Sequence, residues 1–161
     1  MSDPSNADFD LLQRQLAALT GDEADPLANA ANFVALLYHG LADLNWVGIY
    51  VLRRDELVLG PFQGKPACVR IPLGQGVCGT AMRQKKTLRV ADVHQFSGHI
   101  ACDPESVSEL VVPLLAGARS LGVVDIDSPR PNRFSARDQA GVEALCLSFT
   151  RTIEPTGGGF I

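Results

Sequence analysis

The sequence predicts one α+β domain with a central, mostly antiparallel sheet, helices packed on one face, and connections on the other face that enclose a ligand. Three observations support this prediction. The chain has 161 residues, a length that suits one domain with its own core. Two segments with helical spacing precede a series of short apolar and β-branched runs. A third helical segment closes the chain after these runs.

The first two helices are expected close to the N-terminus. Residues 7–20 repeat apolar side chains at helical spacing, and a glycine follows as a stop. The second helix is expected to begin at Asp25-Pro26, because a capping residue followed by proline is a typical helix start. It is expected to end near Asn45. Residues 1–24 therefore form the N-terminal helical region of the predicted domain.

Six strands are expected from runs rich in apolar and β-branched residues. The first two, 46–53 and 56–62, flank Arg54-Asp55, which is typical of a hairpin. The other four are expected at residues 67–72, 87–92, 109–116 and 120–127. A short helix over residues 76–84 is expected between the third strand and the fourth.

The closing helix is expected to begin at Ser135, because Asp138 follows three residues later in an arrangement similar to a capping box. Cys146 lies on the apolar side of this helix and is expected to be a small buried hydrophobe. Residues 154–161 are expected to be a loose tail. The whole chain, 1–161, is therefore predicted to be a single domain.

Composition and charge argue against several classes of function. The net charge is −4, the 14 basic residues are scattered, and aromatic residues make up only 6% of the chain, so no nucleic-acid partner is expected. The N-terminus is acidic and polar, and no apolar run approaches membrane-spanning length, so no membrane partner is expected either. These features favour a cytoplasmic protein. Because that compartment keeps thiols reduced, the four cysteines are expected to be catalytic, metal-binding or inert.

Three of the cysteines, Cys68, Cys78 and Cys102, stand near strand ends or in loops rather than in core helices. An inert thiol is the simplest interpretation of any one of them, but together they favour redox or metal chemistry. Their separations of ten and twenty-four residues lack the two-to-four-residue spacing that is usual for zinc ligands. A metal site is therefore not predicted, although His94 and His99 could supply nitrogen ligands.

A group of acidic residues is expected in the last two strands. Asp125 and Asp127 are two positions apart in a strand and therefore project from the same face of the sheet. Glu109 begins a neighbouring strand and could join them. The residues alone leave two interpretations equally open. The face could be solvated, or it could form a pocket in which the carboxyl groups differ in pKa and bind an amine while donating a proton.

Four stretches of the sequence carry a family resemblance. In chain order, NWVGIYVL, LVLGPFQGKPACVRIPLGQGVCGTA, DVHQFSGHIACD and LGVVDIDS resemble the free methionine-(R)-sulfoxide reductases built on a single GAF domain. The match covers roughly residues 25–150. This resemblance implies a GAF-type fold and an enzyme that reduces free L-methionine (R)-S-oxide to methionine.

The resemblance also implies roles for three cysteines. Cys102 would attack the sulfoxide and become a sulfenic acid, and Cys68 would be the main thiol that resolves it as a disulfide. Cys78 would be a second thiol that exchanges or relays this disulfide. A thioredoxin-like donor would then reset the enzyme, without a cofactor. A homodimer is a candidate assembly.

The substrate pocket implied by the resemblance has an acidic part and an aromatic wall. Its residues in this chain would be Glu109, Asp125, Asp127, Trp46 and Tyr50. An anionic pocket suits a free amino acid, because the free form carries an ammonium group that a methionine within a protein lacks. The acidic residues would also keep one neutral carboxylic acid next to the sulfoxide oxygen, which makes the sulfur a better electrophile.

Two other functions remain as alternatives. The chain could be a GAF-type ligand-binding module without catalysis, or a thiol-based redox sensor in which the same disulfide is a switch. Sensory modules usually come joined to an output domain, whereas this chain ends eight residues past its last expected helix. Turnover of free methionine sulfoxide separates these alternatives from the enzyme.

Overall fold

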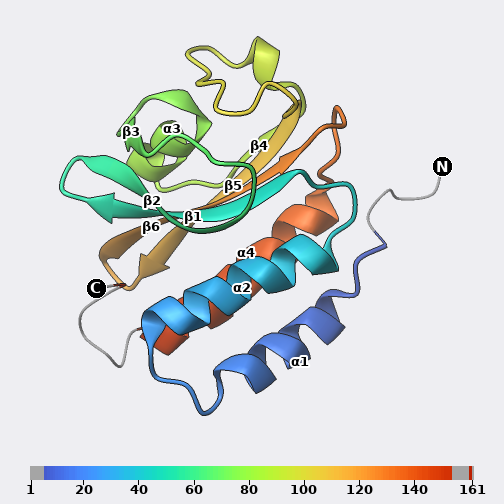
Figure 1. Ribbon diagram of the computed structural model, residues 1–161, viewed down its shortest axis with the longest axis vertical. Helices are drawn as coiled ribbons and strands as arrows, with labels where there is room; N and C mark the ends of the chain where they lie inside the picture. The colour runs from blue at the N-terminus through green and yellow to red at the C-terminus, as the bar shows by residue number, and fades with distance from the viewer. Residues whose placement is uncertain (1–5, 154–159, 161) are drawn as a thin grey trace.

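The computed structural model, which describes residues 6–153 and Phe160, is built around a six-stranded sheet (Figure 1). The strands lie in the order β3-β2-β1-β6-β5-β4, and every neighbouring pair is antiparallel. Their bounds are Trp46–Arg53 (β1), Glu56–Gly64 (β2), Arg70–Pro72 (β3), Leu88–Val90 (β4), Ser108–Ala116 (β5) and Arg119–Ser128 (β6). The predicted antiparallel sheet is therefore confirmed.

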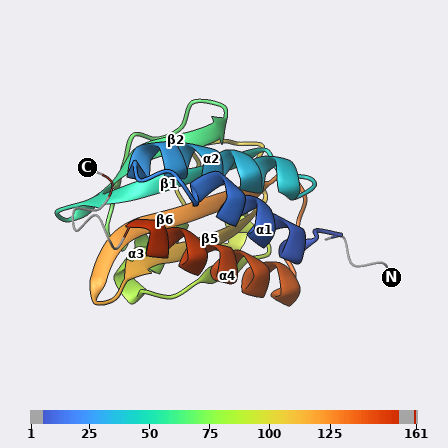
Figure 2. The ribbon, with the colours of Figure 1, turned by 90° about the horizontal axis from the view of Figure 1, so that it is seen from below.

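Helices cover the two faces of this sheet unequally. Helices α1 (Phe9–Thr20), α2 (Pro26–Gly40) and α4 (Ala136–Ile153) lie on one side, where α2 packs on β1 and β2 and α4 packs on β5. Figure 2 shows these three helices in front of the sheet, and α1 packs against the other two. The long connections lie on the opposite face, as predicted, but the short helix α3 (Gly76–Gln84) lies there too, although the helices were expected on one face only (Figure 1).

Three of the expected boundaries are wrong. Helix α2 ends at Gly40 rather than near Asn45, because Leu41 is already extended and Asp43 has a positive φ of 60° that turns the chain into β1. The third strand covers only Arg70–Pro72, so Cys68 lies in the connection before it. The fourth strand is limited to Leu88–Val90. Both short strands lie at the edges of the sheet, where only one neighbour supplies hydrogen bonds.

The sheet separates two apolar clusters. Helices α1, α2 and α4 enclose the larger cluster, which includes Cys146, and the prediction that this cysteine is a small buried hydrophobe is confirmed. Val124 and Ile126 of β6 point into the same cluster. Because successive side chains of a strand alternate between faces, the two aspartates of β6 face the other cluster, beneath α3.

The start of α4 is held by a buried ion pair. Asp138 accepts hydrogen bonds from the backbone N–H of Ser135 at 2.8 Å and from the Arg133 guanidinium at 3.0 Å, which confirms the expected capping arrangement. Arg133 also donates to the carbonyl of Ala42 at 2.9 Å, so it joins the β6–α4 connection to the α2–β1 connection. The predicted loose tail, 154–161, lies outside the described residues except for Phe160.

Replacing Asp138 by Ala should lower the free energy of unfolding by about 3–5 kcal/mol, because Arg133 would keep a buried charge without a counter-ion. Both side chains are only 1% exposed. Urea denaturation of the purified variant measures this loss. The matched control is Glu105→Ala, which breaks a pair with Lys65 whose side chains are 64% and 63% exposed and should cost at most about 1 kcal/mol. Equal losses in the two variants would contradict the prediction.

Candidate active site

An aromatic wall rises from β1 on the face of the sheet that lies beneath α3. Trp46 and Tyr50 project from this face and are stacked with their ring centroids 5.8 Å apart, and both are buried. The Trp46 ring also stacks on Phe62 of β2 at 5.5 Å. Gly48 lies between the two aromatic residues, and a Cβ atom there would lie 2.2 Å from the Trp46 ring. Glycine at this position therefore allows the indole to lie flat along the strand, a requirement that sequence reasoning missed.

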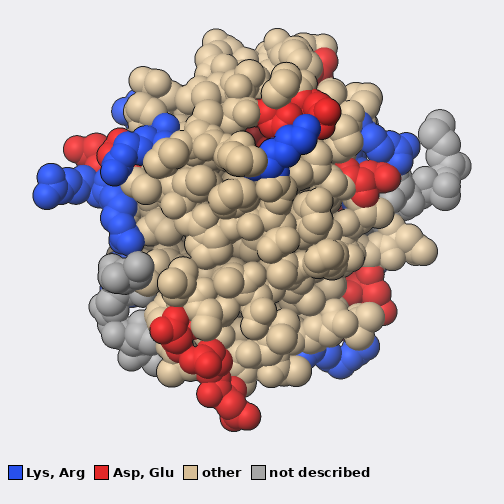
Figure 3. Space-filling view, in the orientation of Figure 1, with Lys and Arg blue, Asp and Glu red and all other residues tan. Residues whose placement is uncertain are grey.

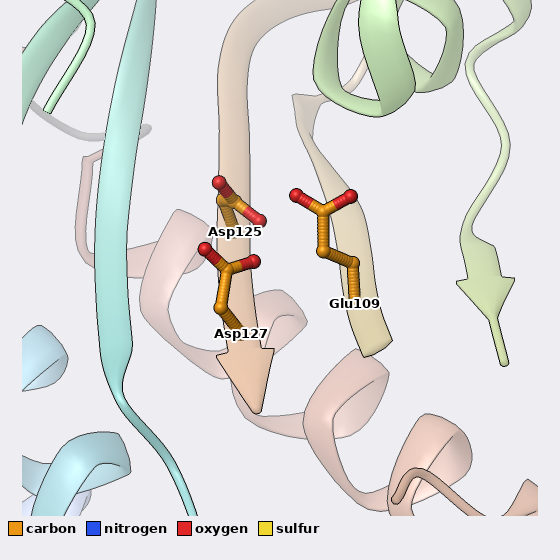
Figure 4. A group of neighbouring side chains, drawn as sticks. All are labelled: Glu109, Asp125 and Asp127. Carbon is orange, nitrogen blue, oxygen red and sulfur yellow. The ribbon is translucent and has the colours of Figure 1, made fainter. Parts of the chain in front are cut away.

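The three predicted carboxyl groups lie together beside this wall (Figure 4). Glu109 of β5 stands directly opposite Asp127 of β6 in the strand register, and Asp125 follows on the same face. Oxygen atoms from all three lie within 4.8 Å of one another. The exposed fractions of the residues are only 7%, 6% and 8%, in the order Glu109, Asp125, Asp127. The structure therefore supports the buried pocket rather than the solvated face.

Burial separates the proton affinities of these groups. It raises the pKa of Asp125 to about 6 and, together with the charge of Asp125, it raises the pKa of Glu109 to about 8. Burial and the two neighbouring carboxylates raise the pKa of Asp127 well above its usual range. At neutral pH, Asp125 is therefore mainly ionised and Glu109 mainly protonated, while Asp127 holds a proton more tightly than an ordinary aspartic acid does.

Each of these residues also has an oxygen atom that is ready for a ligand. Glu109 Oε2, Asp125 Oδ1 and Asp127 Oδ1 are buried and have no hydrogen-bond partner among the described residues. Buried polar atoms are normally paired, so unpaired ones in a cavity favour a ligand that supplies the missing donors and acceptors. A metal ion would fit the oxygen spacing, but two of the carboxyl groups would first have to lose their protons.

Two of the predicted cysteines meet at the mouth of this site. Cys68, in the β2–β3 connection, and Cys102, in the segment that leads to β5, form a disulfide with their Cα atoms 5.5 Å apart. Both residues are half-buried, and Cys102 lines the same cavity as the carboxyl groups. This pairing agrees with the one that the family resemblance implies.

Cys78 is placed differently from the expectation. It lies inside α3, is buried and free, and lines the cavity with its thiol hydrogen-bonded to Asp125. Burial and the charge of Asp125 raise the pKa of this thiol. The glycines around it serve close packing rather than access, because a Cβ atom at Gly79 would lie 2.4 Å from the carbonyl oxygen of Pro72. The short helix over residues 76–84 is confirmed, but the expectation that Cys78 lies outside the core helices is wrong.

The cavity is completed by polar residues that sequence reasoning did not single out. It has a volume of about 530 Å³, including the space at its open mouth. Ser106 lines it and donates to Asp127 at 3.3 Å, and Asn45 donates to Ser106 at 2.9 Å. His99 also lines the cavity, whereas His94 is exposed and bonded to Asp92, so the two histidines do not converge on a metal site. Only the polarity of residues 92–107 could have indicated Ser106.

Charged side chains are spread over the face of the molecule that Figure 3 shows. On the face shown in Figure 3, Lys and Arg side chains lie in separate groups, with acidic side chains and uncharged surface between them. This distribution differs from the continuous basic stripe that nucleic acid favours. Within the described part of the chain, no helix is long and apolar enough to cross a membrane.

Comparisons with known proteins place this geometry in context. The GAF domain family matches residues 14–153. The free methionine-R-sulfoxide reductase of Escherichia coli is 50% identical over 145 residues, which are 90% of this chain and 88% of that protein. The structure of fRMsr of Staphylococcus aureus in complex with substrate is 48% identical, with a TM-score of 0.87 over 91% of this chain and 96% of that one. A free methionine-R-sulfoxide reductase from Neisseria meningitidis, in complex with its substrate, is 40% identical, with a TM-score of 0.87 over 91% and 88% of the two chains.

Proposed function

The chain belongs to the GAF-domain family of free methionine-R-sulfoxide reductases, and from this premise we propose that it reduces free methionine (R)-sulfoxide to methionine. One observation carries the proposal. Cys102 lies at the mouth of a cavity whose three buried carboxyl groups differ in pKa. A thiol next to both a carboxylate and neutral carboxylic acids provides the nucleophile, the amine receptor and the proton donor that this reduction needs.

Substrate binding divides between the acidic and aromatic parts of the cavity. Asp125, the mainly ionised carboxyl group, would accept the ammonium of the free amino acid. Trp46 and Tyr50 would pack against the methylsulfinyl end. Hydrogen bonds from Asp127 and, to a smaller extent, from the Cys78 thiol support this assignment, because donors to the ionised form lower the pKa of Asp125.

The reduction itself transfers one oxygen atom. A proton from Glu109, which is mainly protonated at pH 7, or from Asp127, whose pKa burial raises, would go to the sulfoxide oxygen while the Cys102 thiolate attacks the sulfur. The oxygen then passes, as a hydroxyl group, from the methionine sulfur to the Cys102 sulfur: the substrate sulfur–oxygen bond and the transient sulfur–sulfur bond break, and a sulfur–oxygen bond forms on Cys102. Methionine leaves with two more electrons, and Cys102 becomes a sulfenic acid. The Cys68 thiol displaces this oxygen as water and forms the Cys68–Cys102 disulfide.

Cys68 precedes Cys78 as the resolving thiol in this scheme. The Cys78 thiol is buried and its pKa is raised, so little of it is the thiolate that thiol–disulfide exchange requires. A relay of the disulfide to Cys78 would therefore need α3 or the two cysteine-bearing connections to move.

Reductant, compartment and assembly belong to the same proposal. A thioredoxin-like dithiol would supply the two electrons that restore the thiols, and a reducing cytoplasm would maintain that donor. A homodimer remains a prediction. Exposed Leu11 and Leu19 of α1, with Leu147 of α4, are apolar side chains that a second copy of the chain would cover.

A thiol-based redox sensor is the second candidate function. The observation that favours it is the position of the Cys68–Cys102 disulfide at the cavity mouth, where both residues are half-buried and accessible to an oxidant. A ligand-binding module without catalysis has less support, because it needs neither the disulfide nor neutral carboxylic acids next to a cysteine.

The experiment that tests the proposal compares free methionine (R)-sulfoxide with its N-acetylated form. Acetylation removes the ammonium, and a lost charge-assisted contact costs about 1.5–3 kcal/mol, so kcat/KM should fall at least ~10-fold. Methionine or N-acetylmethionine release in the presence of dithiothreitol is measured by chromatography. Asp125→Asn should reduce the difference in kcat/KM between the two substrates, because it removes the proposed partner of the ammonium. Equal rates on the two substrates would reject the carboxylate receptor, and no release of product from either substrate would leave the redox sensor ahead.

A further inference from the structure

Two aromatic side chains of β1, Trp46 and Tyr50, line the cavity and also donate hydrogen bonds to the connection that carries Cys68. The Tyr50 hydroxyl donates to the carbonyl oxygen of Cys68 at 2.8 Å. The Trp46 indole N–H donates to the carbonyl oxygen of Lys65 at 3.0 Å. The polar ends of these two side chains therefore hold residues 65–68 in place through hydrogen bonds to their backbone.

The other attachments of this connection hold it less directly. Val69 accepts from the backbone N–H of Leu59 at 2.9 Å, which fixes the end of the connection close to β3. The Lys65–Glu105 ion pair links it to the segment after Cys102, but the two side chains are 64% and 63% exposed, so water screens this pair. The hydrogen bond from Tyr50, by contrast, is made to Cys68 itself, and Tyr50 is buried.

The chemistry of Tyr50 suits a permanent donor. Burial, and then the charge of Asp125, raise the pKa of Tyr50 above its ordinary value, so the hydroxyl keeps its proton. The phenol ring lines the cavity while the hydroxyl at its tip is engaged by the backbone of Cys68. The position of the resolving cysteine is therefore tied to a residue of the substrate cavity.

We propose that Tyr50 is a positioning residue for Cys68, holding its backbone so that the thiol stands within bonding distance of Cys102. This inference rests on the proposed function, in which the Cys68 thiol and the Cys102 sulfenic acid condense to a disulfide and one water molecule. The oxygen in that water comes from the sulfoxide, so the step needs no other oxidant. Without the Tyr50 bond, the reduced connection would sample more conformations, and disulfide formation would have to order it again.

The test uses Tyr50→Phe, which keeps the ring and removes only the hydroxyl. The full-length protein is equilibrated in glutathione redox buffers, and the fraction of Cys68–Cys102 disulfide is measured by alkylation and mass spectrometry. The equilibrium constant for disulfide formation should fall about 3- to 10-fold, the range expected for one buried hydrogen bond. Tyr38→Phe is the matched control, because Tyr38 packs against the cluster on the other face of the sheet and should leave the constant unchanged. An unchanged constant in Tyr50→Phe would overturn the proposal.

A second measurement follows the reaction itself. During a single turnover with free methionine (R)-sulfoxide, dimedone traps the Cys102 sulfenic acid before Cys68 reaches it. The trapped fraction should rise in Tyr50→Phe and approach that of Cys68→Ser, which cannot form the disulfide, while Tyr38→Phe should match the wild type. Equal trapping in Tyr50→Phe and the wild type would contradict the positioning role. A wild-type protein that releases no methionine would instead reject the proposed function, and the glutathione measurement would still decide whether Tyr50 positions Cys68.

Discussion

Serine in place of Cys102 should abolish methionine formation and lower kcat/KM at least ~1000-fold. A thiol has an appreciable thiolate fraction at neutral pH, whereas a serine hydroxyl remains protonated unless a strong base is next to it. Glu109 is mainly protonated at neutral pH, and the ionised Asp125 is the proposed partner of the substrate ammonium, so neither of them serves as that base. Methionine release from free methionine (R)-sulfoxide, with dithiothreitol as the reductant, is the measurement.

The matched control for this substitution is Cys146→Ala. Cys146 is buried in the cluster enclosed by α1, α2 and α4, on the face of the sheet away from the cavity. Its loss should lower the free energy of unfolding by ~1 kcal/mol through a small cavity and leave kcat/KM unchanged. Near-wild-type turnover in Cys102→Ser would remove this residue from the nucleophile's role.

Glu109→Gln should lower kcat by about 100-fold or more, because it removes a proton donor to the sulfoxide oxygen. The pH dependence of kcat/KM provides an independent test of this role of Glu109. Burial and the Asp125 charge raise the pKa of Glu109 to about 8, so its acid form is present below that pH and is lost above it. The wild-type kcat/KM should therefore decline as the pH rises through about 8, and this decline should be absent from the residual activity of Glu109→Gln.

Initial rates between pH 6 and pH 10 test both parts of this prediction. The control is Glu56→Gln, the same chemical change at a partly exposed residue at the start of β2, outside the cavity. It should alter neither the rate nor the pH profile. A Glu109→Gln variant that retains the wild-type rate would transfer the donor role to Asp127, whose pKa burial also raises.

Local patterns in the sequence were sufficient to predict most of the fold. The short helix over residues 76–84 and the Arg54-Asp55 hairpin lie where periodicity and turn residues indicated, and so do the six strands, although the two edge strands are shorter than expected. The alternation of side chains along a strand was also sufficient to place Asp125 and Asp127 on one face. These features depend on backbone geometry and on which face of each element is buried. Together these two factors set the spacing at which apolar residues repeat along the sequence.

The sequence by itself thus determined the element order and the faces of the strands, and through the family resemblance it predicted the residues of the site. Only the tertiary structure decided the pKa values of these residues and the pairing of the cysteines. The register of β5 against β6 sets Glu109 opposite Asp127, and the packing of α3 over that face buries both groups together with Cys78. A pKa depends on water excluded by segments that are remote in the sequence, and no local pattern records that exclusion. The pairing of the cysteines likewise depends on how remote segments pack together. Their spacing in the sequence could therefore not show that Cys68 meets Cys102 while Cys78 remains free.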